Sequence, residues 1–314
     1  MRHRNALITT VARSAPRPAF GLALSLLGLV TGAAVAGAAE DSPTLDKIAS
    51  TGTVSIGYRM DASPFSYVDG AGHVIGYTTD LCRRVIDKIG ERLGLDHIDV
   101  VEVPSTAATR FVLVKSGKVD LECTTTTNTA QRREQVAFSY PDFTTATRFV
   151  SRKSDNLDTI ASLSGKSVSS TTGTVNIGQL NAKNLAENLN LSVMLAKSHA
   201  EGFGMVAENR ASAFVMDGIL LADLVASSDH PEDFTISNEA FGPVEPYGIL
   251  MRKDDPVFKD TVNAALKEIY TSGEIHTIYA KWFLSPIPPD GRNLNLPETP
   301  DLAAAFANPQ EYSE

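Results

Sequence analysis

The chain has 314 residues, is 43% hydrophobic and carries a formal charge of −9. This acidity argues against nucleic acid as a partner, because surfaces that bind nucleic acid need an excess of Lys and Arg. The two cysteines, Cys82 and Cys123, cannot form a zinc site without further ligands at suitable spacing.

The first 39 residues have the pattern of a cleaved signal peptide. Four arginines precede an apolar run, Phe20 to Val30, and Ala34 to Ala39 then offers a cleavage site. The run is shorter than the roughly 20 residues that span a bilayer, and no later stretch is long enough. We therefore expect a soluble periplasmic chain of about 275 residues with a charge of −13, because four arginines leave. Whether Cys82 and Cys123 pair in that oxidising compartment stays open.

Predicted strands and helices alternate along the mature chain, which indicates an α/β fold with largely parallel sheets. In the first unit we expect helices over 44–49, 79–93 and 110–115, strands over 53–58, 99–103 and 119–123, and a hairpin turn at 69–72. In the second unit we expect strands over 167–169, 191–195, 213–216 and 247–251, a helix through 180–189 and another ending near 208–210. Helices over 256–270 and 274–283 precede a proline-rich tail that begins at Pro286.

Four consecutive threonines, Thr124 to Thr127, follow the strand predicted over 119–123, and Arg132 lies a few residues beyond them. Hydroxyls, backbone N–H groups and a guanidinium at one place suit a carboxylate, because they converge as donors. The same residues also fit a turn that caps a helix starting near Thr129, with Arg132 as a solvated charge. This stretch alone leaves both interpretations open.

Polar side chains follow several of the other predicted strands. Arg59 and the pair Thr125 and Thr127 follow strands of the first unit, whereas Thr171 to Thr174 and Asp217 follow strands of the second. In open α/β sheets, ligands bind outside the carboxyl ends of the strands. We therefore expect a binding site in a cleft between two lobes.

The charges of this set point to a class of ligand. Arg59, Arg110 and Arg132 are non-titrating cations, His199 could be a fourth, and Asp217 is a lone carboxylate. One arginine can hold an α-carboxylate, Asp217 can bind an ammonium group, and the remaining cations suit a second carboxylate. An α-amino acid with an acidic side chain fits this arrangement. Each residue also has an ordinary alternative, such as a surface arginine, a core histidine or a helix N-cap.

Short motifs spread from about Thr44 to Phe306 carry a family resemblance. They are Gly57-Tyr58-Arg59, Pro64-Phe65-Ser66-Tyr67, Ile75 to Leu81, Ser116 to Asp120, the segment from Thr124 to Arg132, Ala137-Phe138-Ser139, Thr172-Gly173-Thr174, Met216-Asp217 and Lys281-Trp282-Phe283. Together they resemble periplasmic solute-binding proteins of polar amino acid ABC transporters, specifically the glutamate/aspartate-binding subfamily. The resemblance implies a type II fold of two lobes, each a mostly parallel sheet flanked by helices, with a ligand cleft between them.

That fold implies a division of the chain in which lobe I is discontinuous. After the signal peptide, the chain crosses to lobe II and returns, and a hinge lies at each crossing. The implied segments are 1–39 (signal peptide), 40–141 (lobe I, first part), 142–147 (hinge), 148–244 (lobe II), 245–248 (hinge), 249–285 (lobe I, second part) and 286–314 (tail).

The matched positions also imply how the backbone groups of the ligand would be held. Arg132, with Thr125 and Thr127, would bind the α-carboxylate of an amino acid. Asp217 would bind the α-ammonium group. These contacts recognise what every amino acid shares.

Other matched positions would bind the rest of the ligand. Thr171 and Thr174 would reach across from lobe II, and Arg59, Arg110 and His199 would face the side-chain carboxylate. The chain departs from the subfamily in two places. Ala107 replaces a serine and thereby removes a hydroxyl group from the site, and Val112 stands where proline is common.

The implied function is that of a substrate-binding component that delivers L-glutamate or L-aspartate to the membrane permease of an ABC transporter. We expect a monomer without metal or cofactor. One alternative is a binding protein for another polar amino acid, such as glutamine. Another is a dehydratase-type enzyme on the same fold, which would need a general acid or base in the cleft. The sequence shows no Ser-His-Asp pattern, metal cluster or phosphate-binding glycine loop, so we expect no enzymatic activity.

Overall fold

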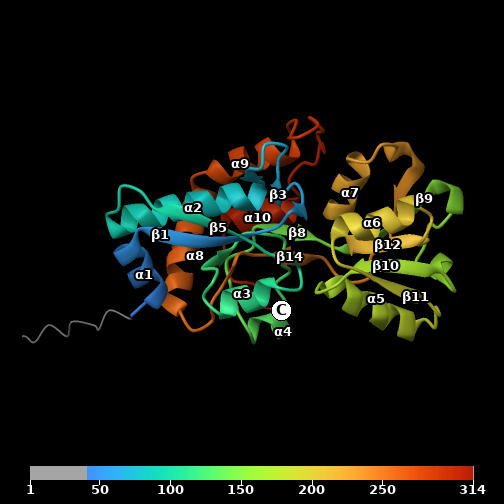
Figure 1. The fold of residues 1–314 in the computed structure, drawn as a ribbon, viewed down its shortest axis with the longest axis horizontal. Helices are drawn as coiled ribbons and strands as arrows, with labels where there is room; N and C mark the ends of the chain where they lie inside the picture. The colour runs from blue at the N-terminus through green and yellow to red at the C-terminus, as the bar shows by residue number, and fades with distance from the viewer. Residues whose placement is uncertain (1–40, 314) are drawn as a thin grey trace, which may run out of the picture. The chain divides into compact units, whose positions relative to one another are not determined.

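The computed structural model describes residues 41–313, in which lobe I is built on one five-stranded sheet (Figure 1). The first strand, β1, has four consecutive buried residues, as expected for a central strand of a parallel sheet. β5 and β6 run parallel to β1, β15 runs antiparallel to β6, and β7 antiparallel to β15. Four of the five strands therefore point the same way. In spatial order they are β5 (Asp99–Pro104), β1 (Thr53–Tyr58), β6 (Leu121–Glu122), β15 (Leu250–Met251) and β7 (Ala137–Phe138).

Lobe II repeats this arrangement with a second five-stranded sheet. β10 pairs in parallel with β11 and β12, whereas β9 is antiparallel to both of its neighbours. The two-lobed α/β fold with mostly parallel sheets is thus confirmed. In spatial order the strands are β11 (Ser192–Ala196), β10 (Ser167–Thr171), β12 (Ala213–Asp217), β9 (Thr147–Arg152) and β13 (Phe234–Ile236).

Two short antiparallel strands carry the chain between the two sheets. β8 (Phe143–Thr145) leads into β9, and β14 (Glu245–Tyr247) leads into β15. The reversed strand of each sheet is therefore the one that the chain enters after a crossing. A separate small sheet beside lobe I contains β2 (Asp61–Ala62), β3 (Ser66–Val68) and β4 (Val74–Ile75).

Helices cover both faces of each sheet. In lobe I, α2, α8 and α9 contribute to a core with β1, whereas α3 packs in a smaller cluster on the other side. In lobe II, α5 lies on one side of the sheet and α6 and α7 on the other (Figure 1). Among residues 41–313, no helix has the length and apolar character needed to cross a membrane. The helices are α1 (Pro43–Thr51), α2 (Tyr77–Leu93), α3 (Arg110–Lys115), α4 (Ala130–Arg133), α5 (Val175–Ala186), α6 (His199–Ala207), α7 (Gly218–Ala226), α8 (Pro256–Thr271), α9 (Glu274–Phe283), α10 (Pro300–Ala307) and the 3₁₀ turns Lys153–Asp155, Ala161–Leu163 and Pro231–Asp233.

The structure corrects several predicted elements. The strand expected over 247–251 is wrong, because the chain bends at Gly248 and its two halves belong to different sheets. The strand expected over 119–123 shortens to β6, and the strands β8, β9 and β13 were not predicted. The predicted signal peptide, residues 1–39, lies outside the described residues.

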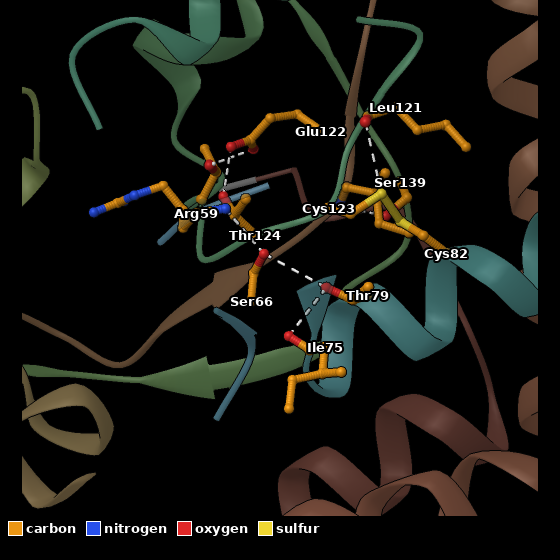
Figure 2. Close-up of a disulfide and its surroundings, with 12 residues drawn as sticks. Arg59, Ser66, Ile75, Thr79, Cys82, Leu121, Glu122, Cys123, Thr124 and Ser139 are labelled. Atoms are coloured by element: carbon orange, nitrogen blue, oxygen red, sulfur yellow. Dashed lines mark hydrogen bonds between the residues drawn. A yellow bond between two sulfur atoms is a disulfide. The ribbon is translucent and has the colours of Figure 1, made fainter. Parts of the chain in front are cut away.

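A disulfide joins Cys82 in α2 to Cys123 at the end of β6, which settles the pairing that the sequence left open. Figure 2 shows that this bond lies beside Thr124 and Glu122. It closes a loop of 41 residues and links the helix to the start of the threonine segment. Such a link restricts the unfolded chain and thereby favours the folded state.

Asp142, at the start of the first crossing, gives a testable dependence of stability on pH. Its carboxyl group is buried, neither oxygen has a hydrogen-bond partner among residues 41–313, and burial raises its pKa to about 8. The folded state therefore holds a proton that the unfolded state loses near its ordinary pKa of 3.8, so stability falls as pH rises from about 4 to about 8.

We expect Asp142→Asn to remove this dependence. Its stability relative to the wild type should grow by up to about 1.4 kcal/mol per pH unit between pH 5 and pH 8, and then level off. Urea unfolding of both proteins at several pH values measures this difference. A constant difference across that range would contradict the assignment.

Candidate functional site

The threonine segment divides its side chains between the core and a hollow between the lobes. Thr124 and Thr126 donate hydrogen bonds of 2.5 and 2.9 Å to the two carboxylate oxygens of buried Glu122. Thr125 and Thr127 instead line the hollow. Successive side chains of the run therefore point alternately toward Glu122 and toward the hollow. Half of the run therefore satisfies a buried carboxylate, and half remains available to a ligand.

The short helix α4 brings Arg132 to the same place. Thr129 is the N-cap of this helix, and its side chain accepts a hydrogen bond from the Arg132 backbone N–H. The Arg132 guanidinium donates to the carbonyl of Thr127 at 2.9 Å and to that of Gly173 at 3.3 Å. The predicted cap of a helix at Thr129 is thus confirmed, but the solvated Arg132 of that interpretation is wrong, because Arg132 is buried. Binding of a carboxylate by this stretch stays a prediction.

Arg59 and Arg110 enter the hollow from lobe I, and each is only 2% exposed. Arg59 donates through Nη2 to Asp61 at 2.8 Å, and Arg110 donates through Nη2 to the carbonyl of Gly173 at 3.4 Å. Within residues 41–313, Nε and Nη1 of Arg59 and Nε of Arg110 have no hydrogen-bond partner. Buried charged donors without partners are costly. An anion in the hollow would remove that cost.

The neighbouring cations also affect each other. Burial, and secondarily the charge of Arg132, lowers the pKa of Arg110 to about 9. Burial also lowers the pKa of Arg132, although Asp217 and Glu245 oppose the shift. Arg110 therefore stays protonated at neutral pH, although burial and the positive charge of Arg132 both disfavour its charged form.

His199, the first residue of α6, is neutral in this arrangement. Burial and the charge of Arg59 lower its pKa to about 3. Nε2 lies 3.3 Å from Nη2 of Arg59, which can only donate, so Nε2 is the acceptor and Nδ1 carries the proton. Nδ1 is 2.9 Å from the hydroxyl oxygen of Thr171, which accepts a hydrogen bond from the Nδ1–H. The idea that His199 could be a fourth cation does not hold in this state.

Asp217 ends β12 and occupies the N-cap position of α7, but its side chain makes no capping hydrogen bond. Its oxygens instead accept from Asn176 at 2.8 Å and from the hydroxyl of Tyr247 at 2.5 Å. Asn176 also donates to Thr147, at the start of β9. Burial raises the pKa of Asp217, whereas these two hydrogen bonds lower it. The carboxylate is thus held by Asn176 of α5 and by Tyr247 of β14.

Gly173 lies where the two lobes meet. Its φ of +84° is unfavourable for other residues, and a Cβ atom here would lie 2.7 Å from the backbone carbonyl of Ala107. Its own carbonyl accepts from both Arg110 and Arg132. Glycine is therefore required for the lobes to approach this closely. Ala107 belongs to this contact and is buried.

The hollow brings together eight of the nine residues predicted for the site. Thr171 is the exception, because it lies behind His199 and positions its ring. The cavity left between these side chains is only about 10 Å³, room for about one water molecule, so an amino acid needs more space than this arrangement of the lobes offers. The lining residues are Arg59, Arg110, Thr125, Thr127, Arg132, Thr174, Val175, Asn176, His199, Met216, Asp217 and Leu220.

Several residues of the site were missed in the sequence. Val175, Asn176 and Met216 adjoin predicted residues, so the end of each strand offered a weak signal. Asp61 and Tyr247 gave none, because their contacts with His199 and Asp217 form only in the folded chain. No cluster of three or more His, Cys, Asp or Glu side chains that could hold a metal ion occurs between residues 41 and 313.

Comparison with known proteins assigns the family. The sequence profile of the bacterial extracellular solute-binding proteins, family 3, matches residues 54–285. The chain belongs to this family. As a solute-binding protein of family 3, it carries its hollow between two lobes, with the tail after residue 285 outside the matched region.

Individual relatives match this chain over most of its length. The solute-binding protein is 39% identical over 275 residues to the L-glutamate/L-aspartate-binding protein of Pseudomonas aeruginosa, covering 87% of this chain and 90% of the relative. It is 34% identical over 293 residues to the glutamate/aspartate import solute-binding protein of Escherichia coli K12, covering 92% and 97%. Among solved structures, the cysteine-binding protein from Campylobacter jejuni has a TM-score of 0.67 at 29% identity, covering 76% and 92%. Family membership alone therefore leaves the ligand undecided.

The division of the threonine segment gives a prediction about stability. Thr124→Val or Thr126→Val leaves one oxygen of buried Glu122 without its donor and should destabilise the solute-binding protein by about 1–3 kcal/mol. Thr125→Val is the matched control, because its side chain lines the hollow. Chemical unfolding of the three variants measures these effects. Equal losses in all three would contradict the division.

Proposed function

We propose that this solute-binding protein is the substrate-binding component of an ABC importer, and that it captures L-glutamate or L-aspartate between its lobes. The observation that carries the proposal is the pair of buried guanidinium groups, Arg59 and Arg110, with N–H donors that find no partner within residues 41–313. A carboxylate is the group that satisfies such donors with both charge and geometry.

The charges on the walls favour an anionic amino acid over a neutral or cationic one. Three guanidinium groups face one carboxylate, that of Asp217, among the lining residues. Glutamate and aspartate carry two carboxylates and one ammonium group, so they offset this excess. Glutamine would bring a neutral amide to the buried arginines, and arginine would bring a like charge. Burial makes such mismatches more costly than they are in water.

Each part of the ligand is assigned to a separate group. Arg132, with Thr125 and Thr127, binds the α-carboxylate from lobe I, and Thr174 adds a contact from lobe II. Asp217 binds the α-ammonium group. Its raised pKa supports this role, because an ammonium partner would favour the charged carboxylate that burial disfavours.

The side-chain carboxylate is assigned to Arg59 and Arg110, with His199 beside them. Thr171 acts through His199, since its hydroxyl accepts a hydrogen bond from Nδ1–H. This leaves the unprotonated Nε2 facing Arg59. The relatives named for glutamate and aspartate support this preference. Ala107 has no hydroxyl where the family resemblance implies a serine. Its presence affects the affinity for the ligand and leaves the preference for an anionic ligand unchanged.

Binding and lobe closure are coupled in this proposal through the two crossings. β8 and β14 serve as the hinge. Tyr247 connects Asp217 to β14, and Asn176 connects it to Thr147, the first residue of β9, which follows β8 in the chain. A ligand held by Asp217 and Arg132 therefore bridges the lobes and favours the closed arrangement. Closure also removes water from the charged groups and strengthens their hydrogen bonds.

We further propose that the chain is exported to the periplasm, acts as a monomer and delivers its ligand to a membrane permease. The import role of the Escherichia coli relative supports the permease as partner. We propose no enzymatic turnover. The low pKa of His199 makes it a weak base at neutral pH, and Asp217 is already held by Tyr247 and Asn176.

Two variants test the assignment of the side-chain carboxylate. Arg110→Leu should weaken glutamate by about 2–5 kcal/mol, because a buried charge pair loses one partner, and should weaken glutamine much less. Arg83→Leu, on the outer surface of α2, is the control and should change neither affinity. Isothermal titration calorimetry measures both ligands. Equal losses for glutamate and glutamine would remove Arg110 from the side-chain subsite.

A further variant tests recognition of the α-ammonium group, which all amino acids share. Asp217→Ala should weaken glutamate, aspartate and glutamine alike, because the α-ammonium group is common to all three. The same calorimetric panel, extended to arginine and cysteine, tests the ligand class in the wild type. Preference for arginine or for a neutral amino acid would overturn the proposed function.

A further inference from the structure

The tail that follows the family match is held firmly against lobe I. The Tyr67 hydroxyl donates to the carbonyl of Pro288 at 2.7 Å, and the Leu296 backbone N–H donates to the carbonyl of Phe283 at 3.0 Å. These contacts fix the loop between positions 288 and 296 at both ends. β3 and α9, which provide them, both belong to lobe I.

From this loop, Arg292 reaches lobe II. Its Nε and Nη2 donate to the two carboxylate oxygens of Asp223 at 2.8 and 3.1 Å, and Nη2 also donates to the Ser63 hydroxyl of lobe I at 2.7 Å. The side chains of Arg292 and Asp223 are 10% and 5% exposed. Asp223 lies in α7, which packs on the sheet of lobe II. This is a buried, bidentate ion pair between the lobes.

The pair is separate from the ligand site, yet it is connected to it by one helix. Leu220, one turn before Asp223 in α7, lines the hollow, whereas Asp223 and Arg292 do not. Further along, the tail and lobe II form opposite walls of a groove that includes Leu302 and Ile219. The tail and lobe II are therefore apart at this groove and joined at the ion pair. The lobes also meet elsewhere, where Arg132 donates to Gly173 and the His199 backbone N–H donates to Asp61.

We propose that Arg292 and Asp223 form an interlobe latch that stabilises the closed arrangement and slows release of the ligand. This proposal rests on the proposed function, in which ligand binding closes the lobes. When the lobes separate, Arg292 stays with lobe I through Ser63 and the fixed loop, while Asp223 moves with α7 into water. The pair therefore contributes only to the closed state, and it biases the equilibrium between the two states. The tail would then tune affinity without contacting the ligand.

Asp223→Asn tests the latch, because it keeps the shape of the side chain and removes its charge. We expect the Kd for glutamate to rise at least about tenfold, through faster dissociation measured by stopped flow. The thermal unfolding temperature of the protein without ligand should fall less than that of the liganded protein, because Asp223 is solvated whenever the lobes are open. Asp290→Asn is the matched control. Asp290 also pairs with Arg292 but is 44% exposed, so its loss should leave Kd within about twofold.

A double-mutant cycle with Arg292→Gln separates the latch from a structural role. The two substitutions should affect the Kd less than additively, because either one alone breaks the pair. An unchanged Kd for Asp223→Asn, or a loss of stability without ligand that equals the loss with ligand, would overturn the latch. So would fully additive effects on the Kd.

Small-angle scattering distinguishes failure of the latch from failure of the proposed function. If the wild type binds no amino acid, the proposed function fails, but the ligand-free proteins still test the latch. Asp223→Asn should then give a larger radius of gyration than the wild type and than Asp290→Asn, because the lobes open more often. If the three ligand-free proteins scatter identically, the latch proposal is overturned.

Discussion

The burial of two guanidinium groups beside a hollow is the constraint on which the rest of this site depends. Arg59 and Arg110 lie in an acidic chain, but their free donors face inward and not toward surface carboxylates. Such an arrangement is costly without an anion, and Arg132 adds to the cost because it raises the local positive charge. The structure tolerates this cost because two packed lobes fix the arginines in place. The same cost then favours binding of a carboxylate.

The surrounding residues can be understood as supports for that constraint. Glu122 accepts hydrogen bonds from Thr124 and Thr126. Thr125 and Thr127 are thereby left to face the hollow. The disulfide between Cys82 and Cys123 holds the strand end from which the run begins (Figure 2). On the opposite wall, hydrogen bonds from Asn176 and Tyr247 hold Asp217. The site is therefore preorganised, which limits the entropy lost when a ligand binds.

The sequence predicted those features that local patterns determine. The strand Thr53–Tyr58 and the helix Glu274–Phe283 have the expected bounds, because alternation and helical periodicity are local signals. Eight predicted residues line the hollow, and they come from strand ends and from helices that follow strands in both lobes. The break within 247–251 was absent from the strand pattern, since sheet membership depends on distant partners, and only the family resemblance implied a hinge over 245–248.

The missed features share a physical origin. Tyr247 and Asn176 acquire their roles from contacts between lobes and crossings, which no short segment encodes. The neutral state of His199 is another example, because its pKa depends on burial and on Arg59, which is 140 residues away in the sequence. Likewise, the proline-rich tail has little periodicity, yet Arg292 forms a buried pair with Asp223. Local sequence thus indicated where a ligand would bind, and the fold determined how the charges are balanced.

The most direct test of this account is a crystal structure of the purified protein grown with L-glutamate. The account predicts the side-chain carboxylate within hydrogen-bond distance of Nε and Nη1 of Arg59 and Nε of Arg110, with the ammonium group at Asp217. A ligand that leaves those donors unpaired, or that binds with its α-carboxylate at Arg59, would contradict it.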